Sequence, residues 1–310
     1  MGKIDPDSGM VKEKGGKTDL RKLAIIASIG YCTIYGFSFM FSRIALMHTD
    51  ADMLLAIRFT VAMLVMLLMV LTGLFKVDLK GKPVGKFLIM GLCQPVIYFI
   101  CETAGIQYTN SSFAGIMISL IPIVTVLMSW IFLKEKVSLS TIGWILCSVA
   151  GVFIISSAQT SSGSIQLRGV FFLLGAVVSA TVFYLISRSV AEAFTPFERT
   201  FIMMVMGFVY FAGKALISKG GEFVPLFVSG LTDAGVMLPV LYLAVVSSVG
   251  AFLLQNFAIT HLDIATATVF ENIIPIISVA AGILLLKEPF SLIQLTGIVL
   301  ILLGVWKVSS

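Results

Sequence analysis

Two acidic residues lie inside long apolar stretches of the sequence, and they are the first candidates for chemistry. Glu102 and Glu271 are each about six residues from the nearer end of such a stretch, a rise of about 9 Å in a helix. A short carboxyl side chain cannot reach water from that depth, and a charge in hydrocarbon is costly. We therefore expect both carboxyls to serve a binding site or to carry protons.

Cations at matching depth are the natural partners of these carboxyls. Arg58 is about five residues into its own apolar stretch, where a long side chain could either reach the interface or serve function. Because neither charge can be left alone in a low dielectric, we predict an ion pair between Arg58 and Glu102. The cations closest in depth to Glu271 are Arg188 and Arg199.

Polar side chains recur at helical spacing around these charges. Gln94 and Tyr98 precede Glu102 at four-residue intervals, so the three share one helical face. Such a polar face should turn toward the protein interior or a water-filled path, although hydrogen bonding between helices would also explain it. The further candidates for a cavity wall are Tyr31, Tyr35, Gln255 and Asn256.

Prolines interrupt two of the apolar stretches. Pro275 removes the hydrogen bond to the carbonyl of Glu271, one turn earlier, so that this carbonyl and the side chains of Glu271 and Asn272 could form a binding or proton-carrying site. Pro122 predicts a similar helix break, but no acidic residue precedes it. This asymmetry favours a function for Glu271.

Signatures of other chemistry are missing from the sequence. It contains no phosphate-binding glycine loop, no metal motif on a helix and no nucleophile elbow. The four cysteines fall in apolar stretches at spacings typical of no metal site, and we expect them to be packing residues. We therefore predict neither a cofactor, nor a metal, nor catalysis.

Composition identifies the class of protein that must position these residues. Of 310 residues, 58% are hydrophobic and only 12% are charged, about half the usual charged fraction of a soluble domain. The apolar runs are continuous rather than alternating, which favours membrane-spanning helices over a barrel. The net charge of +5 arises from basic residues that flank apolar runs, so nucleic acid is not the expected partner.

The apolar runs divide into ten candidate membrane spans of suitable length. They cover residues 23–46, 53–74, 86–108, 112–133, 140–157, 168–190, 197–218, 233–258, 265–286 and 290–307. With a cytoplasmic tail at 1–22, 15 of the 21 lysines and arginines fall on the inner side and four on the outer side. This bias predicts a multi-pass protein of the cell membrane with both termini in the cytoplasm.

The second half of the chain repeats the first. Residues 110–157 align with residues 263–310 at an offset of 153, and 15 of the 48 positions are identical. Two similar phrases mark the repeat, IFLKEKVSL at 131–139 and LLLKEPFSL at 284–292. Because each copy holds five spans, the second enters the membrane upside down, as in many secondary transporters. We therefore predict an all-α membrane protein with ten transmembrane helices in two inverted five-helix repeats, 23–157 and 168–307.

The sequence resembles the EamA-type branch of the drug/metabolite transporter superfamily. Two stretches, 121–135 and 274–288, carry the resemblance, and each begins with Ile-Pro and ends with Leu-Lys-Glu. Residues 106–112 and 56–59 also resemble the family. The resemblance implies a transporter that works by alternating access, often as an exporter, in a family that carries amino acids, other metabolites, sugars and drugs. The tyrosines and Glu102 favour a small polar or aromatic substrate, such as an amino acid or a related compound. Proton coupling through Glu271 would fit. A channel or a membrane-embedded enzyme is the alternative, and the chain could act as a monomer or a homodimer.

Overall fold

The computed structural model describes residues 7–82, 84–133, 138–161, 165–262, 267, 270–288 and 291–309, and the regular elements of these residues are all helices. In chain order they are α1 (Asp7–Ala45), α2 (Ala51–Leu71), α3 (Val84–Gly91), η1 (Leu92–Ile97), α4 (Tyr98–Tyr108), α5 (Ser111–Ile118), α6 (Ile121–Leu133), α7 (Leu139–Ser161), α8 (Leu167–Ser189), α9 (Pro196–Lys219), η2 (Gly220–Glu222), α10 (Phe223–Thr232), α11 (Ala234–Leu241), η3 (Tyr242–Ala251), α12 (Phe252–His261), η4 (Phe270–Asn272), α14 (Ile273–Leu286) and α15 (Leu292–Ser309).

Seven helical stretches of the described residues are long and apolar enough to cross a membrane. Three shorter apolar helices accompany them, at Leu139–Ile155, Phe270–Leu286 and Leu292–Lys307. Many large apolar side chains on these helices are exposed, which is the surface a lipid bilayer would cover. The protein is therefore an all-α, multi-pass membrane protein.

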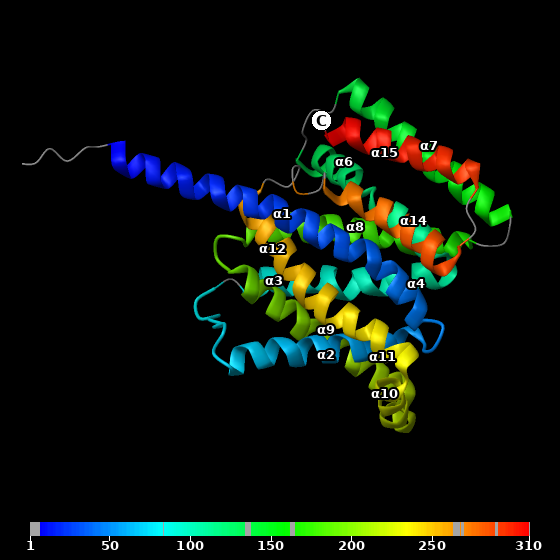
Figure 1. Cartoon of the computed structure of the whole chain (residues 1–310), viewed down its shortest axis with the longest axis horizontal. Helices are drawn as coiled ribbons and strands as arrows, with labels where there is room; N and C mark the ends of the chain where they lie inside the picture. Colours follow the sequence, from blue (N-terminus) through cyan, green and yellow to red (C-terminus); the bar gives the residue numbers. More distant parts are fainter. Residues whose placement is uncertain are drawn as a thin grey trace, which may run out of the picture.

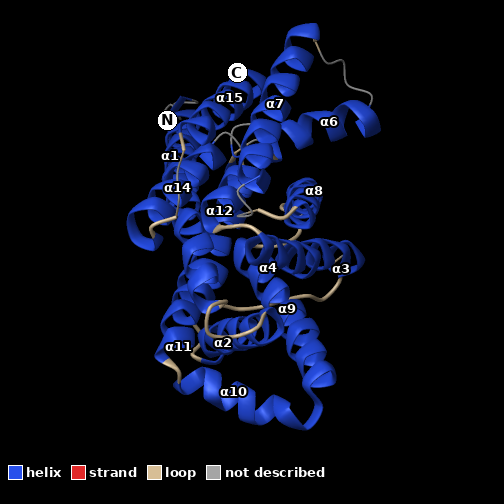
Figure 2. Ribbon diagram, turned by 90° about the vertical axis from the view of Figure 1, so that its right-hand side faces the viewer, coloured by secondary structure: helices blue, strands red, loops and turns tan. Residues whose placement is uncertain are grey.

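The helices lie side by side in a layered bundle. Helices α7 and α15 form one end of it, and α2, α9 and α10 form the other, in both views (Figures 1 and 2). Helix α1 is 39 residues long, which corresponds to about 58 Å at 1.5 Å per residue. Its polar N-terminal turns therefore extend beyond the bundle, while its apolar part begins near Asp19 (Figure 1).

Helices α7 and α15 pack closely on each other through small residues. A Cβ atom on Gly151 would lie 2.6 Å from the carbonyl oxygen of Gly297, so only glycine fits there. Cys147 Sγ lies 3.8 Å from the carbonyl oxygen of Leu300. Gly143, Cys147 and Gly151 recur at four-residue spacing on α7, which predicts close helix packing, with a subunit interface as one option. In the structure, Cys147 and Gly151 contact α15 of the same polypeptide rather than a second subunit.

The segment after α9 differs from the expected loop. The sequence predicts a connection between residues 218 and 233, but this segment contains η2 and the additional helix α10. Gly220 has a positive φ of 53°, a conformation that glycine adopts at little cost, and it turns the chain away from α9. The segment FVPLFVSGLT is apolar enough to form a helix, which lies across the end of the bundle beneath α2 and α11 (Figure 2).

Four of the apolar stretches are interrupted near the middle, and the interruptions fall at related positions. Helices α5 and α6 are separated by a turn at residues 119–120, and α14 is preceded by the 3-10 turn η4. The other two interruptions are η1, a kink at which Gln94 leaves helical geometry just before Pro95, and the π-helical segment η3. π-helical turns occur often at functional sites. Shifting η1 by 153 residues places it within η3.

Candidate functional site

A small buried cavity lies where the polar face of α4 meets α1, α2 and η3. Gln94, Tyr98 and Glu102 all line it, and all three are buried. The cavity measures about 20 Å³, enough for roughly one water molecule. Its other lining residues are Tyr35, Ser38, Phe39, Arg58, Phe99, Ser247 and Phe252.

Two polar atoms of the cavity wall have no hydrogen-bond partner within the protein. They are Gln94 Oε1 and Glu102 Oε2, and both are buried. Buried polar atoms are rarely left unpaired, because each costs about 1–3 kcal/mol. The unpaired oxygens mark this cavity as a place prepared for donors from water or from a ligand.

The guanidinium group of Arg58 is fixed on the opposite half of the chain. Its Nε donates to Ser248 Oγ at 2.9 Å, and its Nη2 donates to Ser247 Oγ at 3.3 Å. The group also lies 4.2 Å from the centre of the Phe99 ring, a cation–π contact. Arg58 is 2% exposed, so its position is determined by these neighbours rather than by the interface.

The predicted ion pair between Arg58 and Glu102 does not form. Both residues line the same cavity, but no Arg58 nitrogen is within 4.0 Å of a Glu102 oxygen. Hydroxyl groups and an aromatic ring hold the cation instead, which the sequence reasoning did not consider. A cation and a carboxyl group therefore face one cavity without neutralising each other directly.

Glu271 belongs to a second polar cluster beside the cavity. Its Oε1 accepts a short hydrogen bond from Tyr184 Oη, and its Oε2 has no partner. Tyr184 Oη in turn accepts from Gln255 Nε2 at 2.7 Å and lies 3.5 Å from Tyr31 Oη. Tyr35 Oη donates to Gln255 Oε1 at 3.2 Å and reaches the cavity wall. The predicted candidates Tyr31, Tyr35, Gln255 and Glu271 thus meet in one place.

The two arginines closest in depth to Glu271 form their hydrogen bonds elsewhere. Arg199 is fully buried and donates to the carbonyl oxygen of Ser187, in the last turn of α8, and to that of Asn256, in the middle of α12. Arg188 donates to the carbonyl oxygens of Ile259 and Thr260 at 2.7 and 2.9 Å. Helix C-termini carry partial negative charge and accept cations well. These two arginines therefore stabilise helix ends, and their similar depth to Glu271 does not lead to an ion pair with it.

The remaining predicted residues lie around these clusters. Asn256 Nδ2 donates to Thr200 Oγ1 at 3.0 Å, and its Oδ1 accepts from Ser187, so its contacts are with α8 and α9 rather than the cavity. Asn272 follows Glu271 in the turn η4. Pro122 is the second residue of α6 and Pro275 the third of α14, each just after a helix interruption.

Sequence reasoning missed Tyr184 and the serines that hold Arg58. The repeat offers a sequence signal for Tyr184, because the offset of 153 relates it to the predicted candidate Tyr31. Ser247 could also have been identified from the repeat, because the offset of 153 that relates Glu102 to Gln255 also relates Gln94 to Ser247. Both members of that second pair line the cavity.

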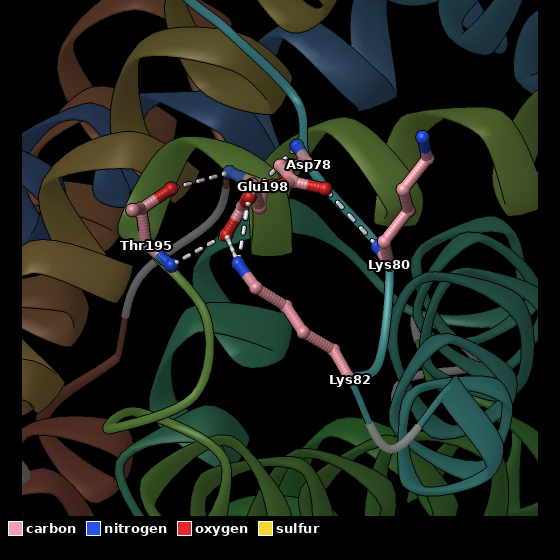
Figure 3. Close-up of polar contacts among 5 residues, drawn as sticks. All are labelled: Asp78, Lys80, Lys82, Thr195 and Glu198. Carbon is pink, nitrogen blue, oxygen red and sulfur yellow. Dashed lines mark hydrogen bonds and ion pairs between the residues drawn. The ribbon is translucent and has the colours of Figure 1, made fainter.

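One end of the antiparallel pair α2 and α9 is closed by Glu198. This carboxyl is 3% exposed and accepts from Lys82 Nζ at 2.8 and 2.9 Å and from the Asp78 amide at 3.0 Å. It also accepts from the Thr195 amide, completing a capping box at the start of α9 (Figure 3). The connection between α2 and α3 is thereby tied to the first turn of α9.

The opposite end of the same helix pair carries more ion pairs. Lys219 Nζ is 2.8 Å from Asp50 Oδ2, and Lys214 Nζ is 2.7 Å from Asp52 Oδ1. Burial raises the pKa of Asp50, but hydrogen bonds from Lys219 and from backbone amides of α2 outweigh it and hold that pKa below the ordinary value. Cations from α9 thus pin the first turn of α2.

Glu288, the last residue of the second Leu-Lys-Glu motif, joins the end of α14 to the start of α5. The carboxylate of Glu288 accepts from the amides of Ser111 and Ser112 at 3.0 and 3.1 Å and from both of their hydroxyls. It therefore caps the N-terminus of α5, where a negative charge is favourable. The first copy of the phrase, Lys134-Glu135-Lys136, lies outside the described residues.

Comparison with known proteins agrees with this architecture. The model of the EamA-like transporter family matches residues 22–157 and 167–310. The chain is 32% identical over 286 residues to "Uncharacterized transporter YcxC" of Bacillus subtilis (strain 168), covering 91% of each chain. It is 24% identical to an "Uncharacterized transporter" of Archaeoglobus fulgidus, over 89% of this chain and 95% of that one. A solved structure described as "Crystal structure of protein" has a similar fold, with a TM-score of 0.61 and 17% identity over 92% of this chain and 95% of that one.

These similarities define a membrane transporter, built of helices and embedded in the bilayer. The chain belongs to the EamA-like transporter family.

Proposed function

We propose that this protein is a secondary transporter that moves a small zwitterionic metabolite, an amino acid or a related compound, by alternating access. The observation that carries the proposal is the cavity shared by Arg58, Gln94 and Glu102, in which a cation and a carboxyl group face the same space without pairing. Such a space suits a molecule with both a carboxylate and an ammonium group.

The substrate would be recognised by charge at one end and by rings at the other. Arg58 is the donor for a carboxylate, which guanidinium groups bind well, and the free oxygens of Glu102 and Gln94 are acceptors for an ammonium group. Phe99, Tyr98 and Phe252 supply aromatic faces for an apolar or aromatic side chain.

Ten spans in two inverted five-helix repeats are part of the proposal. Equivalent contacts in the two halves support it. Arg43 donates to the carbonyl oxygen of Ile106, and Arg188 donates to that of Ile259, which is Ile106 shifted by 153 residues. Ser148 of α7 likewise donates to the carbonyl oxygen of Ile301, its own counterpart at the same offset. The family model also matches the chain twice, once in each half.

Closed ends on both sides of the cavity support alternating access. The cavity as it stands holds about one water molecule, so a metabolite can enter only after helices separate. The closures at Glu198, at Asp50 and Asp52, and at Glu288 each join the first half of the chain to the second. Breaking one set at a time would open the cavity to one side at a time.

Direction and coupling complete the proposal. The bias of lysines and arginines supports cytoplasmic termini in the cell membrane, and the family resemblance favours export. Glu271 is buried, and no lysine or arginine nitrogen of the described residues is within 4.0 Å of it. A carboxyl in that position can carry a proton across the bilayer as the coupling ion.

A thermal-shift screen of the purified protein against the free amino acids and related metabolites tests the binding site. We expect zwitterions to raise the melting temperature of the wild type, and the shift to disappear in Glu102→Gln. The Glu271→Gln variant should keep the shift but lose its pH dependence. If no zwitterion stabilises the protein, or if Glu102→Gln binds equally well, the proposed substrate class is wrong. A channel would instead give conductance in planar bilayers without saturable flux.

A further inference from the structure

A continuous chain of hydrogen bonds joins the wall of the cavity to Glu271. Tyr35, on the cavity wall, donates to Gln255 Oε1 at 3.2 Å. Gln255 Nε2 donates to Tyr184 Oη at 2.7 Å, and Tyr184 Oη donates to Glu271 Oε1. The four residues come from α1, α12, α8 and η4, so the chain of bonds crosses both halves of the protein.

All three donors in this chain point the same way. Each hydrogen is directed from the cavity toward Glu271, which is the order that a negative charge at the end of the chain imposes. Hydrogen bonds in series polarise one another, so a charged acceptor at one end strengthens the whole chain. A bond to a carboxylate is roughly twice as strong as a bond to a neutral acceptor. The orientation of Tyr35 therefore depends on the charge of Glu271.

The surroundings of Glu271 leave it free to change that charge. Its Oε2 has no hydrogen-bond partner and can receive a proton without breaking an existing bond. Helix α14, which follows Glu271 directly, contributes no titratable side chain. The titratable groups that face Glu271 from the other elements are Tyr31 and Cys32 of α1 and Tyr184 of α8, with Tyr35 and Tyr98 further along the cavity wall.

We propose that Tyr184 is the positioning residue that transmits the protonation state of Glu271, through Gln255, to Tyr35 in the cavity. When Glu271 takes a proton on Oε2, its bond from Tyr184 becomes neutral and weakens. Gln255 then holds Tyr35 less firmly, and the Tyr35 hydroxyl turns toward the cavity and its ligand. No proton passes along the chain, because the amide of Gln255 only reorients. This inference rests on the proposed proton coupling, but it concerns how the signal travels.

Infrared difference spectroscopy during a pH titration tests the relay without any substrate. The probe is the proton, and the protein is the full chain in detergent or lipid. The Glu271 signal is the carboxyl band that disappears in Glu271→Gln, and the Tyr35 signal is the phenol band that disappears in Tyr35→Phe. In the wild type, we expect the two signals to titrate together. In Tyr184→Phe, the Glu271 signal should persist and the Tyr35 signal should be lost.

Two further variants make the test decisive. Gln255→Leu breaks the next link and must also abolish the Tyr35 response, which covers the case in which Tyr184→Phe does not fold. Tyr242→Phe is the matched control, because the Tyr242 hydroxyl donates to the Ile34 carbonyl oxygen and takes no part in the hydrogen-bond series from Tyr35 to Glu271. This variant must leave the Tyr35 response intact. A Tyr35 response that survives in Tyr184→Phe or Gln255→Leu, or that is absent from the wild type, overturns the relay. Neither result bears on whether the protein binds and transports a zwitterion, which the thermal-shift screen decides separately.

Discussion

Lys82 Nζ lies 2.8 Å from Glu198 Oε2, although the two residues are 116 positions apart in the chain. This ion pair ties the connection after α2 to the first turn of α9, and it is the most buried of the four ion pairs among the described residues. Buried ion pairs with several hydrogen bonds are costly to break from one side only. The proposed transport cycle therefore includes a defined step in which Glu198 releases its partners on this side.

Variants at Glu198 should separate its capping role from its ion pair. Glu198→Gln keeps a residue that can complete a capping box but removes the negative charge that holds Lys82. Glu198→Ala removes both, and we expect it to lose about 3–5 kcal/mol of stability. Glu198→Gln should lose less and should favour the state open on the Lys82 side. Thermal melting of both variants measures the loss of stability; equal losses would show that the capping box adds nothing beyond the ion pair.

Arg58 and Arg199 should respond differently to substitution, although both are buried. Arg58→Lys keeps the charge but not the planar fork that reaches Ser247 and Ser248, so we expect at least about a tenfold loss of zwitterion affinity with little change in melting temperature. Arg199→Met removes the donor to the Ser187 carbonyl oxygen near the end of α8 and should cost about 2 kcal/mol of stability. Melting curves with and without the zwitterion test both. An Arg58→Lys protein that binds normally would remove this residue from the site.

The contact between α1 and α14 should tolerate no added atom at Gly36. A Cβ there would lie 2.6 Å from Ile277 Cβ, so Gly36→Ala forces the two helices apart and should cost about 1–3 kcal/mol. Gly143→Ala is the control, because nothing lies within 4 Å of its Cβ position. Alanine is a better helix former than glycine, so Gly143→Ala should be neutral or stabilising. Equal melting temperatures for the two variants would contradict this packing.

The ion pair between Asp50 and Lys219 should weaken in acid. The pKa of Asp50 is held below its ordinary value of about 3.9. Its contribution to stability is therefore complete above that ordinary value and is lost as the pH falls through the lower, folded-state pKa. Asp50→Asn keeps a good N-cap for α2 but removes the charge. The melting temperature of this variant should lie below that of the wild type at neutral pH, and the gap should close in acid; a gap that is constant with pH would contradict the assignment.

The apolar stretches were predictable because each is a continuous run with a clear end. Each of the ten predicted spans overlaps a long or shorter apolar helix of the structure, and the interruptions beside Pro122 and Pro275 lie where proline chemistry suggests. The kink at η1 and the π-helical segment η3 could not be predicted from the sequence, because several backbone conformations can accommodate Pro95 or Pro239. Helix α10 was missed because it is short and follows a glycine turn.

Depth along a helix was a useful guide to the site, but rotation and neighbours were not available from one sequence. The depth argument brought Glu102 and Arg58 to the same cavity, yet it wrongly paired them, because Ser247 and Ser248 of a distant helix take the guanidinium group. The same argument found Arg188 and Arg199 at a depth similar to that of Glu271, but it did not identify Tyr184 as the hydrogen-bond partner of Glu271. Such choices depend on which helix faces which, and helix packing decides that.

Counterflow in proteoliposomes tests the central claim most directly, namely that Arg58 and Glu102 bind a zwitterion that is carried across the membrane. The zwitterions that stabilise the wild type are loaded inside the vesicles, and the same compounds are added outside in labelled form. The account predicts saturable, transient accumulation of label for the wild type and at least about a tenfold reduction for Arg58→Lys and Glu102→Gln. Flux that does not saturate, or counterflow that both variants retain at the wild-type level, would contradict it.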